Sequence, residues 1–371
     1  MGFASERGAG FGMGRRGVVK ALASGGVLAA GVSALARPAG AAGAVAAEPS
    51  PGPAAVRARW RPRSPLPVKR AEVAVAALGG RMYVVGGTVQ NGDEPPVWAT
   101  TAVHGYDPRR DRWAEHAPLP RPLTHVGAAA LDGRLYVFGG FVTAVHMRPQ
   151  PDAYVFDPRR NQWSRLPDLP VALGSIAVAA VGGRLHLLGG RDSRRVETPE
   201  GSPVSFGLGT VRTHHVYDPV RRSYSTAPSL PGEPRDHAGV AVLDGRVHLV
   251  GGRVEDTVDN LTRHDVYDPR RACWTRAAPL PVARSAGAAV ALDGRLVYAG
   301  GECRPGGDEE TFGDVTVYDP RADRWDAVTD VPGSRHGFGA AALDGRAYFA
   351  AGAPSCGGGA SADTVELTLS H

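Results

Sequence analysis

The chain has 371 residues, and its 42 lysines and arginines against 37 aspartates and glutamates give a formal net charge of +5. A chain of this length can bury an ample core, so it does not need a disulfide framework, and its three cysteines are too few to build one. The first 47 residues hold five basic residues and one acidic residue, which leaves 37 against 36 in the remainder. This nearly neutral remainder gives no support for a nucleic-acid partner.

The N-terminal segment predicts export. The motif RRGVVK at positions 15–20 resembles the twin-arginine signal of bacterial exported proteins, and a weakly hydrophobic stretch follows at positions 21–36. Small residues at positions 44–47 offer a cleavage site. We therefore predict a twin-arginine signal peptide at residues 1–47, a linker at residues 48–55, and a bacterial protein that is secreted or extracytoplasmic. The alternative is an uncleaved anchor, but the apolar run is short and broken by glycine, so we expect no membrane span after cleavage.

An aromatic residue followed seven positions later by a proline recurs six times in the rest of the chain, at intervals of about 50 residues. The pairs are Trp60/Pro67, Trp113/Pro120, Trp163/Pro170, Tyr224/Pro231, Trp274/Pro281 and Trp325/Pro332. Self-similarity at this period is typical of a propeller built from repeated four-stranded sheets.

Each repeat also carries the signals of a β-hairpin followed by two further strands. In the second repeat, Asp132-Gly133 separates two apolar runs, which is a strong hairpin signal because a type I′ turn needs positive φ at both central residues. A glycine pair ends the second run at positions 86–87, 139–140, 189–190, 251–252 and 300–301, with Ala351-Gly352 as a degenerate sixth copy. Tyr-Asp-Pro or Phe-Asp-Pro closes the third strand in five repeats, because proline cannot continue a ladder.

The double glycine, the aromatic residue before Asp-Pro and the tryptophan six residues after that aspartate together resemble the kelch repeat. The resemblance implies an all-β fold, a six-bladed kelch β-propeller in which strands a to d of each blade run from the axis outward. The last repeat has a candidate third strand at 362–367 but no aromatic fourth strand, whereas residues 56–60 form a spare strand that carries Trp60. We therefore predict that this N-terminal strand completes the last blade and closes the ring, and that the propeller spans residues 56–369.

Two of the cysteines, Cys303 and Cys356, follow the second strand of adjacent repeats. Their loops emerge on the same face of the predicted propeller, so a disulfide between them is compatible with an oxidising compartment, and the sequence leaves their state open. Cys273 lies beside Trp274 in an outer strand and is expected to be a lone thiol. None of the three has the spacing of a metal site.

Candidate binding residues precede strand a of each blade, on the face formed by the d–a connections and the b–c loops, which we call the loop face. These segments vary in length, unlike the short turns of the opposite turn face, and variable loops on a rigid frame usually carry binding. The polar residues there are Arg70, Glu72, His125, Ser175, Arg235, Asp236, His237, Arg284, Ser285, Arg335 and His336. Two interpretations stay open. Either the arginines brace the blades, or arginine and histidine form a pocket for a carboxylate, a phosphate or sugar hydroxyls.

Enzymes with kelch propellers suggest further interpretations. Copper enzymes that resemble galactose oxidase need a tyrosine–cysteine crosslink, and the sequence offers no such assembly. The iron motif of plant nitrile-specifier proteins is similar to Glu255 and Asp259, but His264 comes one residue late, so this is a weak metal candidate. Bacterial sialic-acid mutarotases are exported kelch propellers of the same blade number. That resemblance implies acid–base work on a sugar, with Glu72, Arg235 and His237 as candidates.

The sequence thus favours an exported kelch-propeller binding module, with a carbohydrate or a protein partner at the loop face. The alternative is a sugar-processing enzyme resembling sialic-acid mutarotases that acts at the channel mouth, and a metal-dependent kelch enzyme is more remote. We predict no cofactor, no metal site beyond the weak candidate above, and a monomer.

Overall fold

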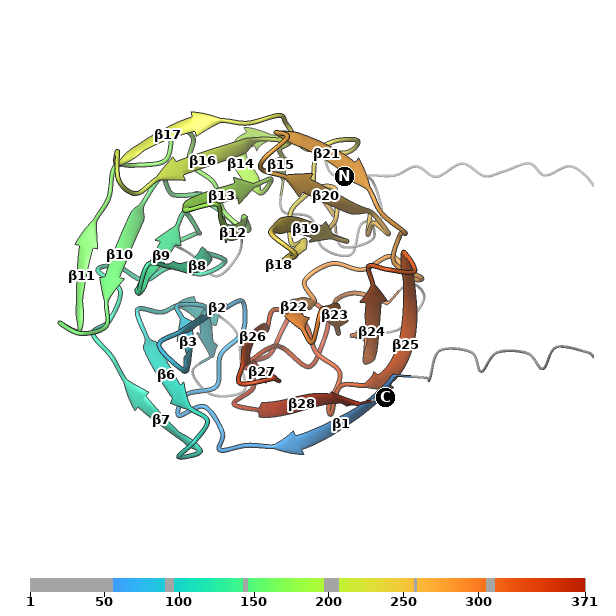
Figure 1. Cartoon of the computed structure of the whole chain (residues 1–371). Helices are drawn as coiled ribbons and strands as arrows, with labels where there is room; N and C mark the ends of the chain where they lie inside the picture. The colour runs from blue at the N-terminus through green and yellow to red at the C-terminus, as the bar shows by residue number, and fades with distance from the viewer. Residues whose placement is uncertain are drawn as a thin grey trace, which may run out of the picture. The chain divides into compact units, whose positions relative to one another are not determined.

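The structure is a computed structural model and describes residues 56–90, 97–142, 146–196, 207–256, 259–304 and 311–370. The predicted signal peptide and linker lie outside the described residues. Six four-stranded antiparallel sheets form a ring, with the innermost strands facing its centre (Figure 1). Within the described residues, no helix has the length and apolar character needed to cross a membrane.

The first three blades follow one another along the chain. Blade 1 consists of β2 (Ala74–Leu78), β3 (Arg81–Val85), β6 (Val103–Asp107) and β7 (Arg112–Glu115). Blade 2 consists of β8 (Gly127–Leu131), β9 (Arg134–Phe138), β10 (Ala153–Asp157) and β11 (Gln162–Arg165). Blade 3 consists of β12 (Ala177–Val181), β13 (Arg184–Leu188), β16 (His214–Asp218) and β17 (Ser223–Thr226).

The remaining blades repeat this order until the ring closes. Blade 4 consists of β18 (Gly239–Leu243), β19 (Arg246–Val250), β20 (His264–Asp268) and β21 (Cys273–Arg276). Blade 5 consists of β22 (Ala288–Leu292), β23 (Arg295–Ala299), β24 (Asp314–Asp319) and β25 (Arg324–Asp330). Blade 6 consists of β26 (Gly339–Leu343), β27 (Arg346–Ala350), β28 (Thr364–Ser370) and β1 (Arg57–Pro62).

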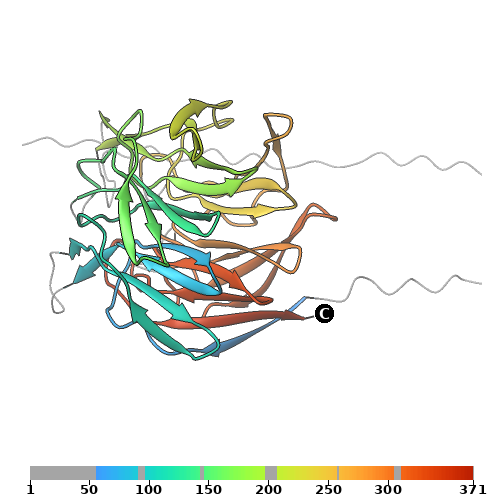
Figure 2. The same cartoon turned by 60° about the vertical axis from the view of Figure 1, so that its left-hand side comes forward.

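The predicted closure of the ring is confirmed. Strand β1 pairs antiparallel with β28, with Trp60 opposite Leu367, and the two ends of the propeller lie side by side (Figure 2). The C-terminal strand is longer than the sequence suggested, since β28 runs to Ser370. The outer edge of β28 is therefore covered by the start of the propeller, which leaves blade 6 with four strands like the others.

Two short hairpins decorate the loop face. The b–c loop of blade 1 contains β4 (Thr88–Gln90) and β5 (Val97–Ala99), and that of blade 3 contains β14 (Arg191–Arg195) and β15 (Leu208–Thr210). Both hairpins extend from the end of a strand b, so the frame positions them above the channel side of the blades.

The recurring glycine pairs couple each blade to the next. At Gly139, a Cβ atom would lie 2.2 Å from the carbonyl oxygen of Leu173, at the start of blade 3. The N–H group of Gly140 donates to that same oxygen at 2.9 Å. Only glycine allows this approach, which explains why a glycine pair ends strand b in five of the six repeats.

The aromatic residues of the outer strands supply a second link between blades. The indole Nε1 of Trp163 in blade 2 donates to the Ala117 carbonyl of the preceding segment at 2.8 Å, and Trp325 in blade 5 donates to Ala278 at 2.8 Å. These bonds satisfy the polar end of a large apolar ring while its body packs between blades. The repeated tryptophan therefore links neighbouring repeats through one hydrogen bond and the packing of its ring.

Candidate functional site

The site begins with six equivalent residues, one before each strand a, that all have left-handed backbone conformation. They are Glu72, His125, Ser175, His237, Ala286 and Gly337, with φ between 47° and 59°. The N–H group of His125 donates to the carbonyl oxygen of Glu72 at 3.2 Å, and that of Ser175 donates to His125 at 2.9 Å. Ala286 donates in the same way to His237, and Gly337 donates to Ala286, both at 2.9 Å. All six residues line a cavity of about 110 Å³.

Histidine and glutamate side chains converge at one side of these six residues. The Glu72 carboxylate lies 3.1 Å from His125 Nε2, 3.9 Å from His237 Nε2 and 3.5 Å from His336 Nδ1. His146, from the b–c loop of blade 2, joins them with its Nε2 atom 2.6 Å from His125 Nε2. Residues from blades 1, 2, 4 and 6 therefore meet above one side of the channel.

Buried ion pairs surround the imidazoles. Arg191 pairs with Asp236, and Arg253 pairs with Glu302 and lies 3.6 Å from Asp236. Both arginine side chains are completely buried, and a buried charge is tolerated only with partners of this kind. We call the whole set the channel-mouth cluster: Glu72, His125, His146, Arg191, Asp236, His237, Arg253, Glu302 and His336.

The cluster holds its acids ionised and two of its bases neutral. Burial alone would raise the pKa of the Glu72 carboxyl, but His125 and His336 hold it well below its usual range. Arg191 and His237 likewise lower the pKa of Asp236 against the effect of burial. Burial lowers the pKa of His146, reinforced by His125, and it lowers that of His237, reinforced by Arg253. The cluster therefore offers carboxylate oxygens and neutral imidazole nitrogens as ligand atoms.

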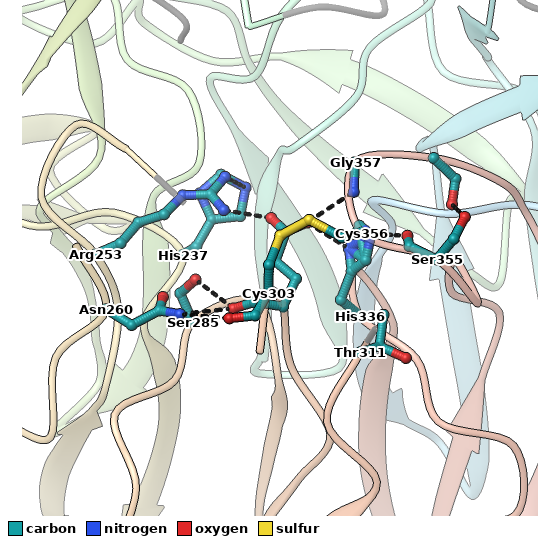
Figure 3. Close-up of a disulfide and its surroundings, with 12 residues drawn as sticks. His237, Arg253, Asn260, Ser285, Cys303, Thr311, His336, Ser355, Cys356 and Gly357 are labelled. Carbon is teal, nitrogen blue, oxygen red and sulfur yellow. Dashed lines mark hydrogen bonds and ion pairs between the residues drawn. A yellow bond between two sulfur atoms is a disulfide. The ribbon is translucent and has the colours of Figure 1, made fainter. Parts of the chain in front are cut away.

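A disulfide joins Cys303 and Cys356, whose Cα atoms are 5.3 Å apart, and so links the b–c loops of blades 5 and 6. It lies between His237 and Arg253 on one side and His336 on the other (Figure 3). Glu302 precedes Cys303, and its carboxylate also accepts from the Gly357 N–H group at 3.3 Å. The disulfide thus anchors the carboxylate that pairs with Arg253. Cys273 is the free cysteine, as expected.

The structure brings together five of the eleven polar residues predicted on the loop face, while Ser175 lines the same cavity and the Ser285 hydroxyl donates to the Glu302 carbonyl at 3.4 Å. Glu72, His125, Asp236, His237 and His336 belong to the channel-mouth cluster. The four candidate arginines, Arg70, Arg235, Arg284 and Arg335, lie inside the blades instead.

These four arginines each hold the b–c junction of their own blade. Arg70 donates to the carbonyl oxygen of Ala102 at 2.8 Å, and Arg284 donates to that of Asp314 at 2.8 Å. Arg235 binds the Asp265 carboxylate at 2.5 Å, and Arg335 reaches the carbonyl of Ala351 at 3.3 Å. The guanidinium groups therefore brace their own blades and not the neighbouring blades that the bracing interpretation expected, and these four residues do not form a pocket of guanidinium groups.

The weak metal candidate does not assemble. His264 lies on β20, where its Nε2 atom bonds His248 at 2.9 Å and its Nδ1 atom bonds the Ala278 carbonyl at 3.2 Å. Asp259 is exposed on the b–c loop and Glu255 is partly exposed. Both histidine nitrogens are engaged inside the blade, so these residues do not form a ligand set.

Sequence reasoning missed four members of the cluster, namely His146, Arg191, Arg253 and Glu302. Three of them directly follow a glycine pair and form a β-bridge with the residue three places before strand a, as Arg253 does with Asp236. The position after each glycine pair therefore faces the channel mouth. Including the residue after each glycine pair among the candidate positions, together with the d–a connections, would have identified these three residues.

A cavity of about 450 Å³ lies on the turn face between blades 3 and 4. Its Arg184 is paired with Asp218 at 3.5 Å, and the same pair recurs as Arg246 with Asp268 and as Arg295 with Asp319. The repeat copies this feature from blade to blade, so we regard the groove as part of the scaffold.

Comparison with known proteins agrees with the repeat pattern. Residues 122–170 and residues 283–332 each match the kelch motif. Kelch-like protein terF of Aspergillus terreus is 29% identical over 303 residues, which cover 76% of this chain and 61% of that protein. Kelch-like protein 25 of Xenopus tropicalis is 26% identical over 282 residues, which cover 73% of this chain and 43% of that protein.

A solved structure, that of YjhT, superposes with a TM-score of 0.67 at 18% identity and covers 83% of this chain and 99% of that one. At this identity the likeness shows the fold alone. The chain spans less than two thirds of the length of the two relatives above, so it does not inherit their whole-protein activities. The chain is a six-bladed β-propeller that carries kelch repeats.

Proposed function

We propose that the protein is an exported binding module that docks a protein partner on the loop face of its propeller. The observation that carries this proposal is the distribution of exposed apolar side chains. Among the described residues, six large apolar side chains are exposed, and five belong to the loop face: Val68, Trp98, Met147, Val171 and Val282.

Trp98 is the expected anchor of this surface. It lies on β5, in the hairpin that extends from blade 1, and 54% of its surface is exposed. Met147 lies in the b–c loop of the adjacent blade and is 43% exposed. Tryptophan and methionine are enriched in protein interfaces, where a few such residues carry most of the binding energy. An exposed tryptophan on a strand of the loop face therefore fits a docking role.

The sugar-processing alternative has less support. It requires Arg235 beside His237 in an open pocket, but the Arg235 guanidinium is buried against Asp265. A carbohydrate that stacks on Trp98 would use the same loop face without catalysis, so it is an alternative outcome of the same experiment.

The test is site-specific photocrosslinking from the two faces. A photoreactive amino acid replaces Trp98 in one variant and Val220 in the other, since Val220 lies on the turn face and is 89% exposed. We expect a protein adduct from position 98, competed by excess unlabelled wild-type chain and not by Trp98→Ala, and none from position 220. Equal adducts from both positions would refute a loop-face partner, and glycan-array binding lost in Trp98→Ala would reassign the ligand to carbohydrate.

We further propose that the module is exported by the twin-arginine pathway and acts as a monomer. The Cys303–Cys356 disulfide supports an oxidising compartment. Replacing Arg15 and Arg16 together by lysine should retain the chain in the cytoplasm, whereas replacing Arg7 by lysine should leave export intact. Light scattering of the exported chain should give the mass of one copy.

A further inference from the structure

The three histidines of the channel-mouth cluster are arranged around one point. His125, His146 and His237 each offer a ring nitrogen, and these nitrogens all lie within 4.8 Å of one another. The ring centroids are 4.2 to 5.2 Å apart, and each pair of rings is inclined by 72° to 76°. Three imidazole nitrogens this close together are within reach of a single metal ion.

A hydrogen bond holds the ring of His125, and an ion-pair contact lies beside the ring of His237. His125 Nδ1 lies 2.9 Å from the Thr124 hydroxyl, and His237 Nδ1 lies 3.1 Å from the Asp236 carboxylate. When Nδ1–H donates to such an oxygen, Nε2 keeps its lone pair, which is the usual outer arrangement around a metal-bound histidine. The Thr124 hydroxyl can donate onward to the Glu72 carbonyl at 3.5 Å.

A carboxylate completes the donor set. Glu72 Oε2 lies 3.1 Å from His125 Nε2 and 3.9 Å from His237 Nε2, on the side of the cavity of about 110 Å³. An ion held by these four residues would keep room for water or a small anion, because a single water needs roughly 10–15 Å³. The three carboxylates of the cluster also outnumber its two guanidinium groups, so a cation would offset the excess charge.

We propose that His125, His146 and His237, with Glu72, bind one divalent transition-metal ion at the channel mouth. Imidazole-rich sites suit Zn²⁺, Fe²⁺, Co²⁺, Ni²⁺ and Cu²⁺, whereas Mg²⁺ and Ca²⁺ take oxygen ligands. The Arg253 guanidinium, which pairs with Glu302, donates to His237 Nε2 at 3.4 Å, so a bound metal ion would replace this contact at the His237 lone pair. None of these four ligands belongs to the docking surface, although His146 directly precedes Met147.

The test measures metal binding by the tag-free, disulfide-bonded chain. Equilibrium dialysis against Co²⁺ and Zn²⁺ should give one equivalent per chain, with a visible Co²⁺ spectrum typical of nitrogen and oxygen ligands. His146→Ala should weaken the affinity at least about tenfold, since even outer-shell changes cost 10- to 100-fold. It removes a loop side chain and no strand residue, so the fold should persist, and circular dichroism of the metal-free protein checks this.

Two control variants test whether the metal is held by these four residues. His215→Ala removes another buried imidazole, on β16, and should keep one equivalent. Replacing Cys303 and Cys356 together by serine should also keep it, which excludes a site made by reduced cysteines near Glu302. Absence of bound metal in the wild type would overturn the proposal, as would full retention of metal by both His146→Ala and His125→Ala.

Discussion

Two pairs of buried histidines in blades 3 and 4 make a specific prediction about acid stability. In blade 4, His248 Nδ1 bonds His264 Nε2 at 2.9 Å, and His264 Nδ1 donates to the Ala278 carbonyl at 3.2 Å. His186 and His214 repeat this chain in blade 3. His264 must be neutral for this arrangement, because a proton on its Nε2 atom would face the Nδ1–H group of His248, and burial disfavours a charge on His248.

The magnitude follows from the pKa values of the blade 4 pair. Burial, assisted by His264, lowers the pKa of His248 from 6.5 to about 3, and burial lowers that of His264 to about 4. Because the folded values lie below the unfolded one, the stability is fully present above pH 6.5 and is lost as the pH falls toward 4. As the pH falls from 8 to 5, each histidine should lower the free energy of unfolding by about 2 kcal/mol, so the pair should lower it by about 4 kcal/mol.

Blade 5 supplies the matched replacement, since Val297 and Val315 occupy the same two positions of its strands b and c. We therefore expect the double variant His248→Val with His264→Val to lose about 4 kcal/mol less than the wild type between pH 8 and pH 5. Urea denaturation at several pH values measures this difference. An acid-induced loss of stability equal to that of the wild type would refute the assignment of this effect to the histidine pair.

Three further predictions concern the frame and the site. Gly139→Ala should lower the free energy of unfolding by more than about 2 kcal/mol, because the new Cβ atom would meet the Leu173 carbonyl. Gly133→Ala, with open space around it, should lower it by about 1–2 kcal/mol. Thermal melts compare the two variants, and equal losses of stability would contradict the Leu173 contact. Replacing both Cys303 and Cys356 by serine should lower the free energy of unfolding by about 4 kcal/mol, because the disulfide closes a loop between residues 53 positions apart. An unchanged denaturation midpoint would contradict this prediction. Arg235→Ala should cost about 3 kcal/mol by leaving Asp265 short of a partner, yet leave metal stoichiometry unchanged, and loss of the metal would return this arginine to the site.

The fold was predictable because the same sequence features recur in six repeats. The glycine pairs, the Asp-Gly turns and the outer aromatic residues each have one local geometric reason, and none depends on a distant residue for its interpretation. Even the closure by β1 followed from counting, since one strand was spare at the start and one was missing at the end. The register between strands a and b follows from turns of two residues, which leave little freedom.

The site was only partly predictable because it breaks the repeat. Glu72, His125 and His237 could be found by comparing the same position in successive blades. His146 could not, because it lies in a b–c loop with no counterpart in the other repeats. The role of the arginines could not be predicted from the sequence, because an arginine before strand a can either bind a ligand or brace the blade. The distances from Arg70 to the Ala102 carbonyl and from Arg235 to the Asp265 carboxylate show that these two side chains brace the blade.

The account places the chemistry of this molecule at the channel mouth, where loops from several blades converge. The most direct measurement is anomalous diffraction at the cobalt edge from crystals of the tag-free chain grown with one equivalent of Co²⁺. We predict one strong peak bounded by the Nε2 atoms of His125, His146 and His237, within bonding distance of Glu72. No peak there, or the main peak elsewhere on the propeller, would contradict the account.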